Sequence, residues 1–121
     1  MFQVETDKSK NLLTLTFSGH ITQPETHRWK DEIKTRLADL HPGFKLLADL
    51  TRMDAMDFAC APDIEAVMEL CNRAGISKVV RIIPDPSKDI GLNIMSLFHY
   101  RRGVTIVTCE TMEEALGALT D

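Results

Sequence analysis

The sequence predicts an α/β domain with a mixed, mostly parallel sheet of five strands and about four helices. Two observations predict this class. Apolar residues recur at strand spacing and then at helix spacing, in repeated alternation after an opening pair of strands. The 121 residues are 44% hydrophobic and 26% charged, which excludes disordered, collagen-like and disulfide-scaffold proteins. We expect one domain over residues 1–121.

The first half of the chain predicts two strands, a helix and a central strand. Alternating residues over 2–6 and 13–17 predict an opening hairpin with a polar turn. Thr22-Gln23-Pro24-Glu25 has the pattern of a capping box and opens a helix that stops at His41-Pro42-Gly43. The mostly apolar run 44–50 predicts a central strand that is covered on both faces.

The second half repeats the alternation of helix and strand, which predicts right-handed crossovers between parallel strands. An irregular stretch is expected at 57–61. The elements expected after it are a helix around Ile64 to Cys71 ended by Gly75, a strand at 78–83, a helix from Asp85-Pro86 to about Gly103, a strand at 104–108, and a short helix opened by the capping box Thr111-Met112-Glu113-Glu114.

Charge and the N-terminal sequence exclude several kinds of partner. The net charge is −4, and the strongest basic cluster, Arg101-Arg102 with His99, is too small to bind nucleic acid. The first eight residues lack the apolar run of a signal peptide, and no stretch approaches the about 20 apolar residues of a membrane span. We therefore expect a cytoplasmic protein with no nucleic-acid partner and no membrane insertion.

No motif in the sequence predicts catalysis or a cofactor, so we expect a protein that is not an enzyme. The three cysteines have no spacing typical of zinc ligands, and we expect buried, reduced thiols at Cys60, Cys71 and Cys109. No HExxH or GxSxG motif is present. A cysteine–histidine pair formed across space remains an alternative.

The segment after the central strand is where a ligand of an open α/β sheet would bind, because the carboxyl ends of the strands lie there. It contains three carboxylates, which either bind a partner or bond nearby backbone amides: Asp49, Asp54 and Asp57. It also contains three large apolar residues in an expected loop, which either enter the core or form an adaptable patch for a protein partner: Met53, Met56 and Phe58. A receiver-like phospho-acceptor at Asp49 is disfavoured, because the expected acidic pair and lysine of such domains are absent.

The residues Leu47-Ala48-Asp49-Leu50-Thr51, followed by Met53 and by Met56-Asp57 before a helix, resemble the signature of STAS domains. This family includes the anti-sigma-factor antagonist SpoIIAA and the cytoplasmic tails of sulfate transporters. The expected element order matches the family over the whole chain. Pro42-Gly43-Phe44, Asp49-Leu50-Thr51 and Asn93-Ile94-Met95-Ser96 resemble its SpoIIAA-like branch. The resemblance implies a regulatory module that binds a protein, either an anti-sigma factor, a kinase or a second copy in a homodimer.

The chain departs from the family at the position that controls binding. The resemblance implies a phospho-acceptor serine after the Met-Asp pair, but Phe58 and then Ala59 stand there. A phosphate would add about −1.5 to −2 charges, and neither side chain can accept one. The partner-binding residues implied by the resemblance are Asp49, Thr51, Met53, Met56, Asp57 and Phe58. A small-molecule or lipid-binding module is the alternative, because the SpoIIAA-like branch resembles part of CRAL-TRIO domains.

Overall fold

A five-stranded sheet forms the centre of the structure, a computed structural model that describes residues 1–83, 85, 100 and 103–120. The strands follow one another across the sheet in chain order. Strand β1 runs antiparallel to β2, and every later pair is parallel. The expected mixed, mostly parallel sheet is confirmed. Its strands are β1 (Phe2–Asp7), β2 (Leu12–Ile21), β3 (Lys45–Met56), β4 (Lys78–Ile82) and β5 (Thr105–Cys109).

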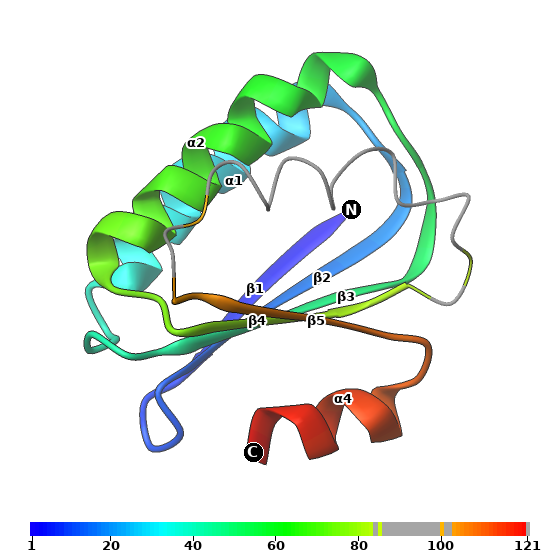
Figure 1. Cartoon of the computed structure of the whole chain (residues 1–121). Coiled ribbons are helices and arrows are strands. Elements are labelled where there is room, and N and C mark those ends of the chain that lie inside the picture. The colour runs from blue at the N-terminus through cyan, green and yellow to red at the C-terminus, as the bar shows by residue number, and fades with distance from the viewer. Residues whose placement is uncertain (84, 86–99, 101–102, 121) are drawn as a thin grey trace.

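Helices cover both faces of the sheet. Helices α1 (Gln23–Leu37) and α2 (Ala61–Ala74) lie side by side on one face, and α4 (Met112–Thr120) lies on the other (Figure 1). A 3-10 turn, η1 (Phe58–Cys60), joins β3 to α2. The helix expected from Asp85-Pro86 to about Gly103, with His99 and Arg101-Arg102 near its end, lies outside the described residues except for Asp85, Tyr100 and Gly103. No helix in the described part of the chain is long and apolar enough to cross a membrane.

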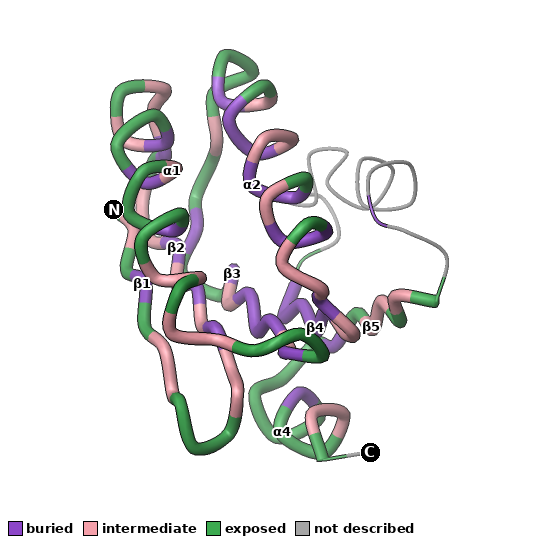
Figure 2. Tube along the Cα trace, turned by 90° about the vertical axis from the view of Figure 1, so that its left-hand side faces the viewer, coloured by how far each residue is buried: buried purple, intermediate pink, exposed green. Residues whose placement is uncertain are grey.

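Each face of the sheet has its own hydrophobic cluster, and β3 contributes to both. Leu46, Ala48 and Leu50 pack in the larger cluster beneath α1 and α2, whereas Leu47 packs in the smaller cluster beneath α4. This alternation follows from the period of two in a strand. Buried residues accordingly line the inner sides of the helices and run along the strands (Figure 2). All three cysteines are free and buried, as the sequence predicts.

Strand β3 is longer than the sequence predicts. It continues to Met56, although a loop was expected after Leu50. Its pairing with β2 shifts register twice, so β3 holds one extra residue between Asp49 and Arg52 and another between Met53 and Ala55. Each β-bulge inverts the alternation of side chains. The expectation of a loop was wrong here because the bulges interrupt the period-two pattern that marks a strand.

The two predicted capping boxes have different outcomes. At α4, the backbone N–H of Glu114 donates to Oγ1 of Thr111 over 3.2 Å, which is the predicted capping bond. At α1, Thr22 is the N-cap residue, but its side chain makes no capping hydrogen bond. The carboxylate of Glu25 accepts hydrogen bonds from the hydroxyl of Thr22, at 3.3 Å, and from its backbone N–H, and it also lies 3.1 Å from the N-terminal amine of Met1. The start of α1 and the pairing of Thr22 with Glu25 were therefore predicted correctly, but the bond from the Thr22 side chain to the backbone is absent.

Candidate functional site

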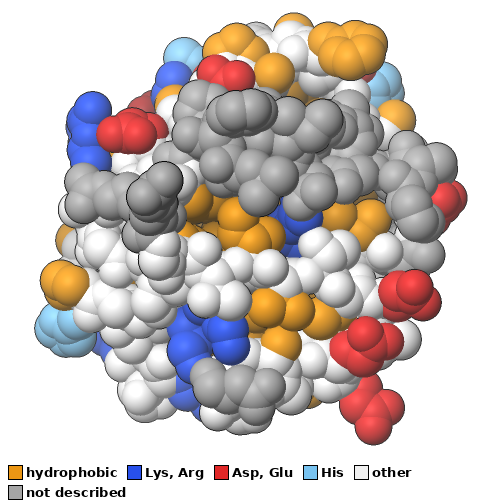
Figure 3. All heavy atoms as spheres, viewed as in Figure 1, with side chains coloured by type: hydrophobic (Ala, Val, Ile, Leu, Met, Phe, Trp, Pro, Cys, Tyr) orange, Lys and Arg blue, Asp and Glu red, His pale blue; other side chains and the backbone are white. Residues whose placement is uncertain are grey.

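The junction at which β3 passes through η1 into α2 presents an exposed aromatic ring. Phe58 is 89% exposed, more than any other large hydrophobic residue in the described part of the chain. Hydrophobic side chains gather at the top of Figure 3, at the end of the molecule where this junction lies. An exposed phenyl ring among other surface apolar side chains is a candidate contact for a partner.

The residues on both sides of Phe58 hold the junction against the core. Met56 is half-buried and packs against the larger cluster, and the backbone N–H of Asp57 donates to the carbonyl of Ile21 over 3.0 Å. Cys60 is fully buried, with its Sγ 3.7 Å from the same carbonyl. Because the chain is anchored inward before and after η1, the Phe58 ring remains in solvent.

His20, at the end of β2, lies beside this ring-bearing turn. Its Nε2 is 2.6 Å from Oδ1 of Asp57, and both side chains are substantially exposed. Parallel pairing of β2 with β3 places His20 opposite Ala55, and so brings it next to a residue 37 positions later. Sequence reasoning missed His20 as a site residue, because no local motif connects positions so far apart in the chain.

Asp49 and Thr51 lie away from the exposed ring. Oδ1 of Asp49 accepts hydrogen bonds from the backbone N–H of Thr51 at 3.0 Å and from its hydroxyl at 2.7 Å. Asp49 alternates with Leu47 along the strand, so it is on the α4 face of the sheet. Of the two interpretations given for the carboxylates after the central strand, hydrogen bonding to a nearby backbone amide therefore holds for Asp49. These bonds stabilise the first bulge of β3.

Met53, the third apolar residue predicted for this segment, is part of the core. Met53 is fully buried in the cluster beneath α1 and α2. Its side chain is not available to a partner, so the core interpretation holds for Met53. Of the six residues that the resemblance implies, only Asp57 and Phe58 lie together in solvent at the junction, with Met56 half-buried beneath them.

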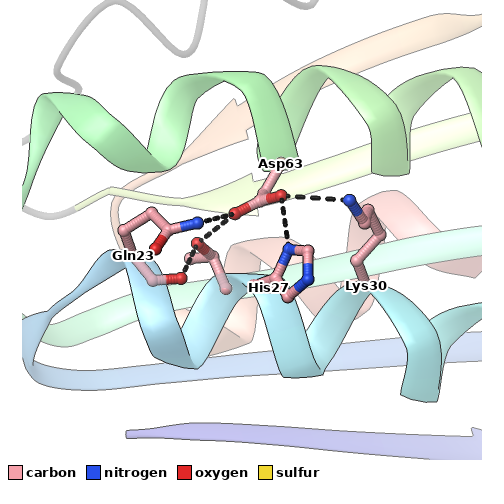
Figure 4. Close-up of polar contacts among 5 residues, drawn as sticks. Gln23, His27, Lys30 and Asp63 are labelled. Carbon is pink, nitrogen blue, oxygen red and sulfur yellow. Dashed lines mark hydrogen bonds and ion pairs between the residues drawn. The ribbon is translucent and has the colours of Figure 1, made fainter.

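A buried carboxylate fixes the first turn of α2 to α1 (Figure 4). Oδ2 of Asp63 accepts a hydrogen bond from the hydroxyl of Thr26 at 2.8 Å and lies 3.5 Å from Nε2 of Gln23. Its Oδ1 is 3.2 Å from Nζ of Lys30 and 3.7 Å from Nδ1 of His27. Burial acts to raise the pKa of Asp63, but the hydrogen bonds from Thr26 and Lys30 and the nearby positive charges outweigh it and hold that pKa below its usual value.

The cysteines lack the environment of catalytic nucleophiles. Burial raises the pKa of the Cys60 and Cys109 thiols and raises that of Cys71 to about 12. A nucleophilic cysteine needs a lowered pKa and access to substrate. In the described part of the chain, no group of three or more histidine, cysteine or acidic side chains could hold a metal ion.

A pocket between the sheet and the two helices is too small for a lipid. Its volume is about 50 Å³, whereas sites for drug-sized ligands occupy roughly 300–1,000 Å³. The described residues that line it are mostly apolar: Leu15, Phe17, Trp29, Leu46, Ala48, Leu50, Ile64, Val67, Met68, Val79, Arg81 and Tyr100. This pocket does not favour the alternative of an enclosed lipid.

Solved structures share this architecture over nearly the whole chain. No family model and no curated protein matches the sequence. An uncharacterised protein with a SpoIIAA-like fold from Shewanella loihica has a TM-score of 0.70 and 18% identity, covering 98% of this chain and 92% of that one. The unphosphorylated form of SpoIIAA has a TM-score of 0.67 and 16% identity, with coverage of 99% and 98%. An anti-sigma factor antagonist from Mycobacterium paratuberculosis has a TM-score of 0.63 and 21% identity, with coverage of 100% and 94%.

The strand order and the helices on the two faces define a STAS-like α/β domain. More particularly, the chain has the fold of SpoIIAA, as the residues around Asp49 predict.

Proposed function

We propose that this chain is a non-enzymatic regulatory module that binds a partner protein through the junction surface, defined as His20, Asp57, Phe58, Ala59 and Pro62. The exposure of Phe58 is the observation that carries the proposal. Burying a phenyl side chain is worth about 1.5–3 kcal/mol. Aromatic residues at the centre of an interface contribute a large share of binding energy, so the ring is the expected anchor.

The named relatives support a protein as the partner. Two solved structures with this fold are anti-sigma factor antagonists, and SpoIIAA has been solved in phosphorylated and unphosphorylated forms. The class of partner proposed for this chain is an anti-sigma factor or a kinase. The partner's surface must supply an apolar pocket for the Phe58 ring and polar groups that complement the His20–Asp57 pair.

Binding at the junction surface is proposed to be constitutive. Phe58 stands where the STAS signature carries its phospho-acceptor serine, and a phenyl ring has no hydroxyl. The buried contact between Asp63 and Thr26 holds α2 in place directly after the turn that carries the ring. The ring is then presented permanently, and no change in charge at residue 58 can switch it off.

Affinity purification of the tagged chain, followed by direct titration with the protein it captures, tests this function. Phe58→Asp should weaken that binding by about 10- to 100-fold, as the burial energy of the ring predicts. Leu116→Ser, which changes another exposed apolar residue far along the chain, is the matched control and should leave the affinity unchanged. Equal affinities for the wild-type chain and Phe58→Asp would refute the assignment of the junction surface. Capture of no protein would refute the proposed function itself.

A further inference from the structure

The outward face of α4 carries apolar side chains that no described residue covers. Leu116 is 53% exposed and Met112 is 41% exposed, whereas Ala115 is fully buried against the sheet. Met112, Leu116 and Thr120 are four residues apart, so they share one side of the helix. Gly117 adjoins Leu116 and is also exposed.

A groove continues this apolar face toward the start of β2. Its volume is about 430 Å³, and its described lining residues are Lys10, Leu12, Lys45, Leu116, Leu119 and Thr120. Together with Met112 and Gly117, these residues are called the α4 surface. It lies on the opposite side of the sheet from α1 and α2 and is separate from the junction surface.

The α4 surface is flanked by acidic side chains at one end and by basic side chains at the other. Three glutamates lie around the start of the helix: Glu110, Glu113 and Glu114. Lysines surround its end, where Nζ of Lys45 donates to the carbonyl of Leu119 and Nζ of Lys78 donates to that of Ala118, each over 2.5 Å. Figure 3 shows acidic side chains at the lower right, where α4 begins, and basic side chains at the lower left, where it ends.

This distribution of charge is complementary to itself when two helices pack antiparallel. A two-fold axis places the same patch of both copies in contact. A contact between one residue of the first copy and another residue of the second is then repeated with the two copies exchanged. If the axis passes near Leu116 and Gly117, the glutamates of each copy lie over the lysines of the other, and the apolar side chains meet in the middle. Parallel packing would instead bring like charges together.

Gly117 supports close packing at that axis. A glycine within a helix costs about 1 kcal/mol relative to alanine. The chain's own fold does not require it, because a Cβ atom at this position would meet nothing within 4 Å and the backbone there has no positive φ. A missing side chain at this point lets two helix backbones approach closely.

We propose that a second copy of this chain binds the α4 surface, with the two α4 helices antiparallel about a two-fold axis near Leu116 and Gly117. The area offered by one nine-residue helix and its groove is small compared with a standard protein interface. The dimer is therefore weak, with a dissociation constant in the micromolar range or above. The proposal does not depend on the proposed function, because it uses a different surface.

Sedimentation velocity over a series of concentrations of the full chain tests the proposal. The wild-type chain should show a reversible monomer–dimer equilibrium that weakens with added salt, because charge pairs are screened. Leu116→Ser should weaken dimerisation by about tenfold, since it removes buried apolar area at the axis. Gly117→Gln should weaken it at least as much without lowering the stability of the monomer, because the new side chain meets only the second copy.

Charge reversal adds a specific signature. Lys10→Glu and Glu113→Lys should each weaken dimerisation, because each variant places like charges at positions 10 and 113 across the axis. An equal mixture of the two variants should restore dimerisation, because position 10 of each copy then faces an opposite charge at position 113 of the other. Phe58→Asp is the control and should dimerise like the wild-type chain. Monomer at every concentration would overturn the proposal. A dimer insensitive to Leu116→Ser and Gly117→Gln, or not restored in the mixture, would also overturn it.

Discussion

The hydroxyl of Thr26 on α1 donates a 2.8 Å hydrogen bond to Oδ2 of Asp63 on α2, and both residues are buried. Asp63 lies in the first turn of α2, directly after the turn that carries Phe58. This contact therefore links the position of the exposed ring to helix α1. A buried carboxylate that loses a donor keeps its desolvation penalty, so the contact is also important for stability.

Thr26→Val should lower the free energy of unfolding by about 1–3 kcal/mol, because it removes the donor and keeps the shape of the side chain. Thr35→Val on the same helix is the matched control, since the Thr35 hydroxyl is exposed and donates to the backbone carbonyl of Asp31. Urea denaturation followed by the fluorescence of Trp29, the single tryptophan, measures both effects. Similar losses in the two variants would contradict the role given to Thr26.

Asp63 should make the free energy of unfolding depend on pH in the acidic range. Its pKa is lower in the folded chain than the usual 3.8, so the folded state favours the charged carboxylate. The stability that the charged carboxylate contributes is fully present at a pH above the pKa of Asp63 in the unfolded chain. It is lost as the pH falls through the pKa of Asp63 in the folded chain. The stability advantage of the wild-type chain over Asp63→Asn should therefore hold at neutral pH and shrink as the pH falls below about 4. Urea denaturation over this range checks it, and a constant difference between the two proteins would contradict it.

Tyr100, the single tyrosine, should remain protonated in alkali for as long as the chain is folded. Burial raises its pKa well above the usual 10.0, Cys71 adds to the shift, and Arg81 opposes it. Because the folded state holds the phenolic proton more tightly, folding stability should fall as the pH rises above 10.0. The ultraviolet absorbance of phenolate should appear together with the loss of folded Trp29 fluorescence. Phenolate that forms in the folded chain would contradict the burial of Tyr100.

The two N-cap threonines should differ in their contribution to stability. Thr111→Ala should cost about 1 kcal/mol, because it removes a side-chain bond to the backbone N–H of Glu114. Thr22→Ala should cost less, since Thr22 makes no such bond. Thermal unfolding of both variants measures the difference. A larger loss for Thr22→Ala would show that the N-terminus of α1 depends on Thr22 in another way.

Most of the fold could be predicted from local patterns, whereas the candidate site could be predicted only in part. Helix α2 and its end at Gly75, which has a φ of 93°, follow from helical spacing and a glycine that adopts a left-handed conformation. The exposure of Phe58 was one of two open interpretations. The His20–Asp57 contact could not be predicted, because it depends on how β2 and β3 pair after two bulges.

The bulges of β3 also affect how this segment is to be aligned with related chains. Thr51 is one extra residue, because Leu50 keeps the alternation of buried residues that Leu46 and Ala48 begin. Asp54 is the other, because Met53 and Ala55 pair with consecutive residues of β2. A relative without them would be two residues shorter and would read Leu50-Arg52-Met53-Ala55-Met56, with every apolar anchor still facing the helices. Correct alignment then requires gaps inside a strand, where gaps are ordinarily avoided. Equivalent positions in this segment are better identified by the side of the sheet they occupy than by their order along the chain.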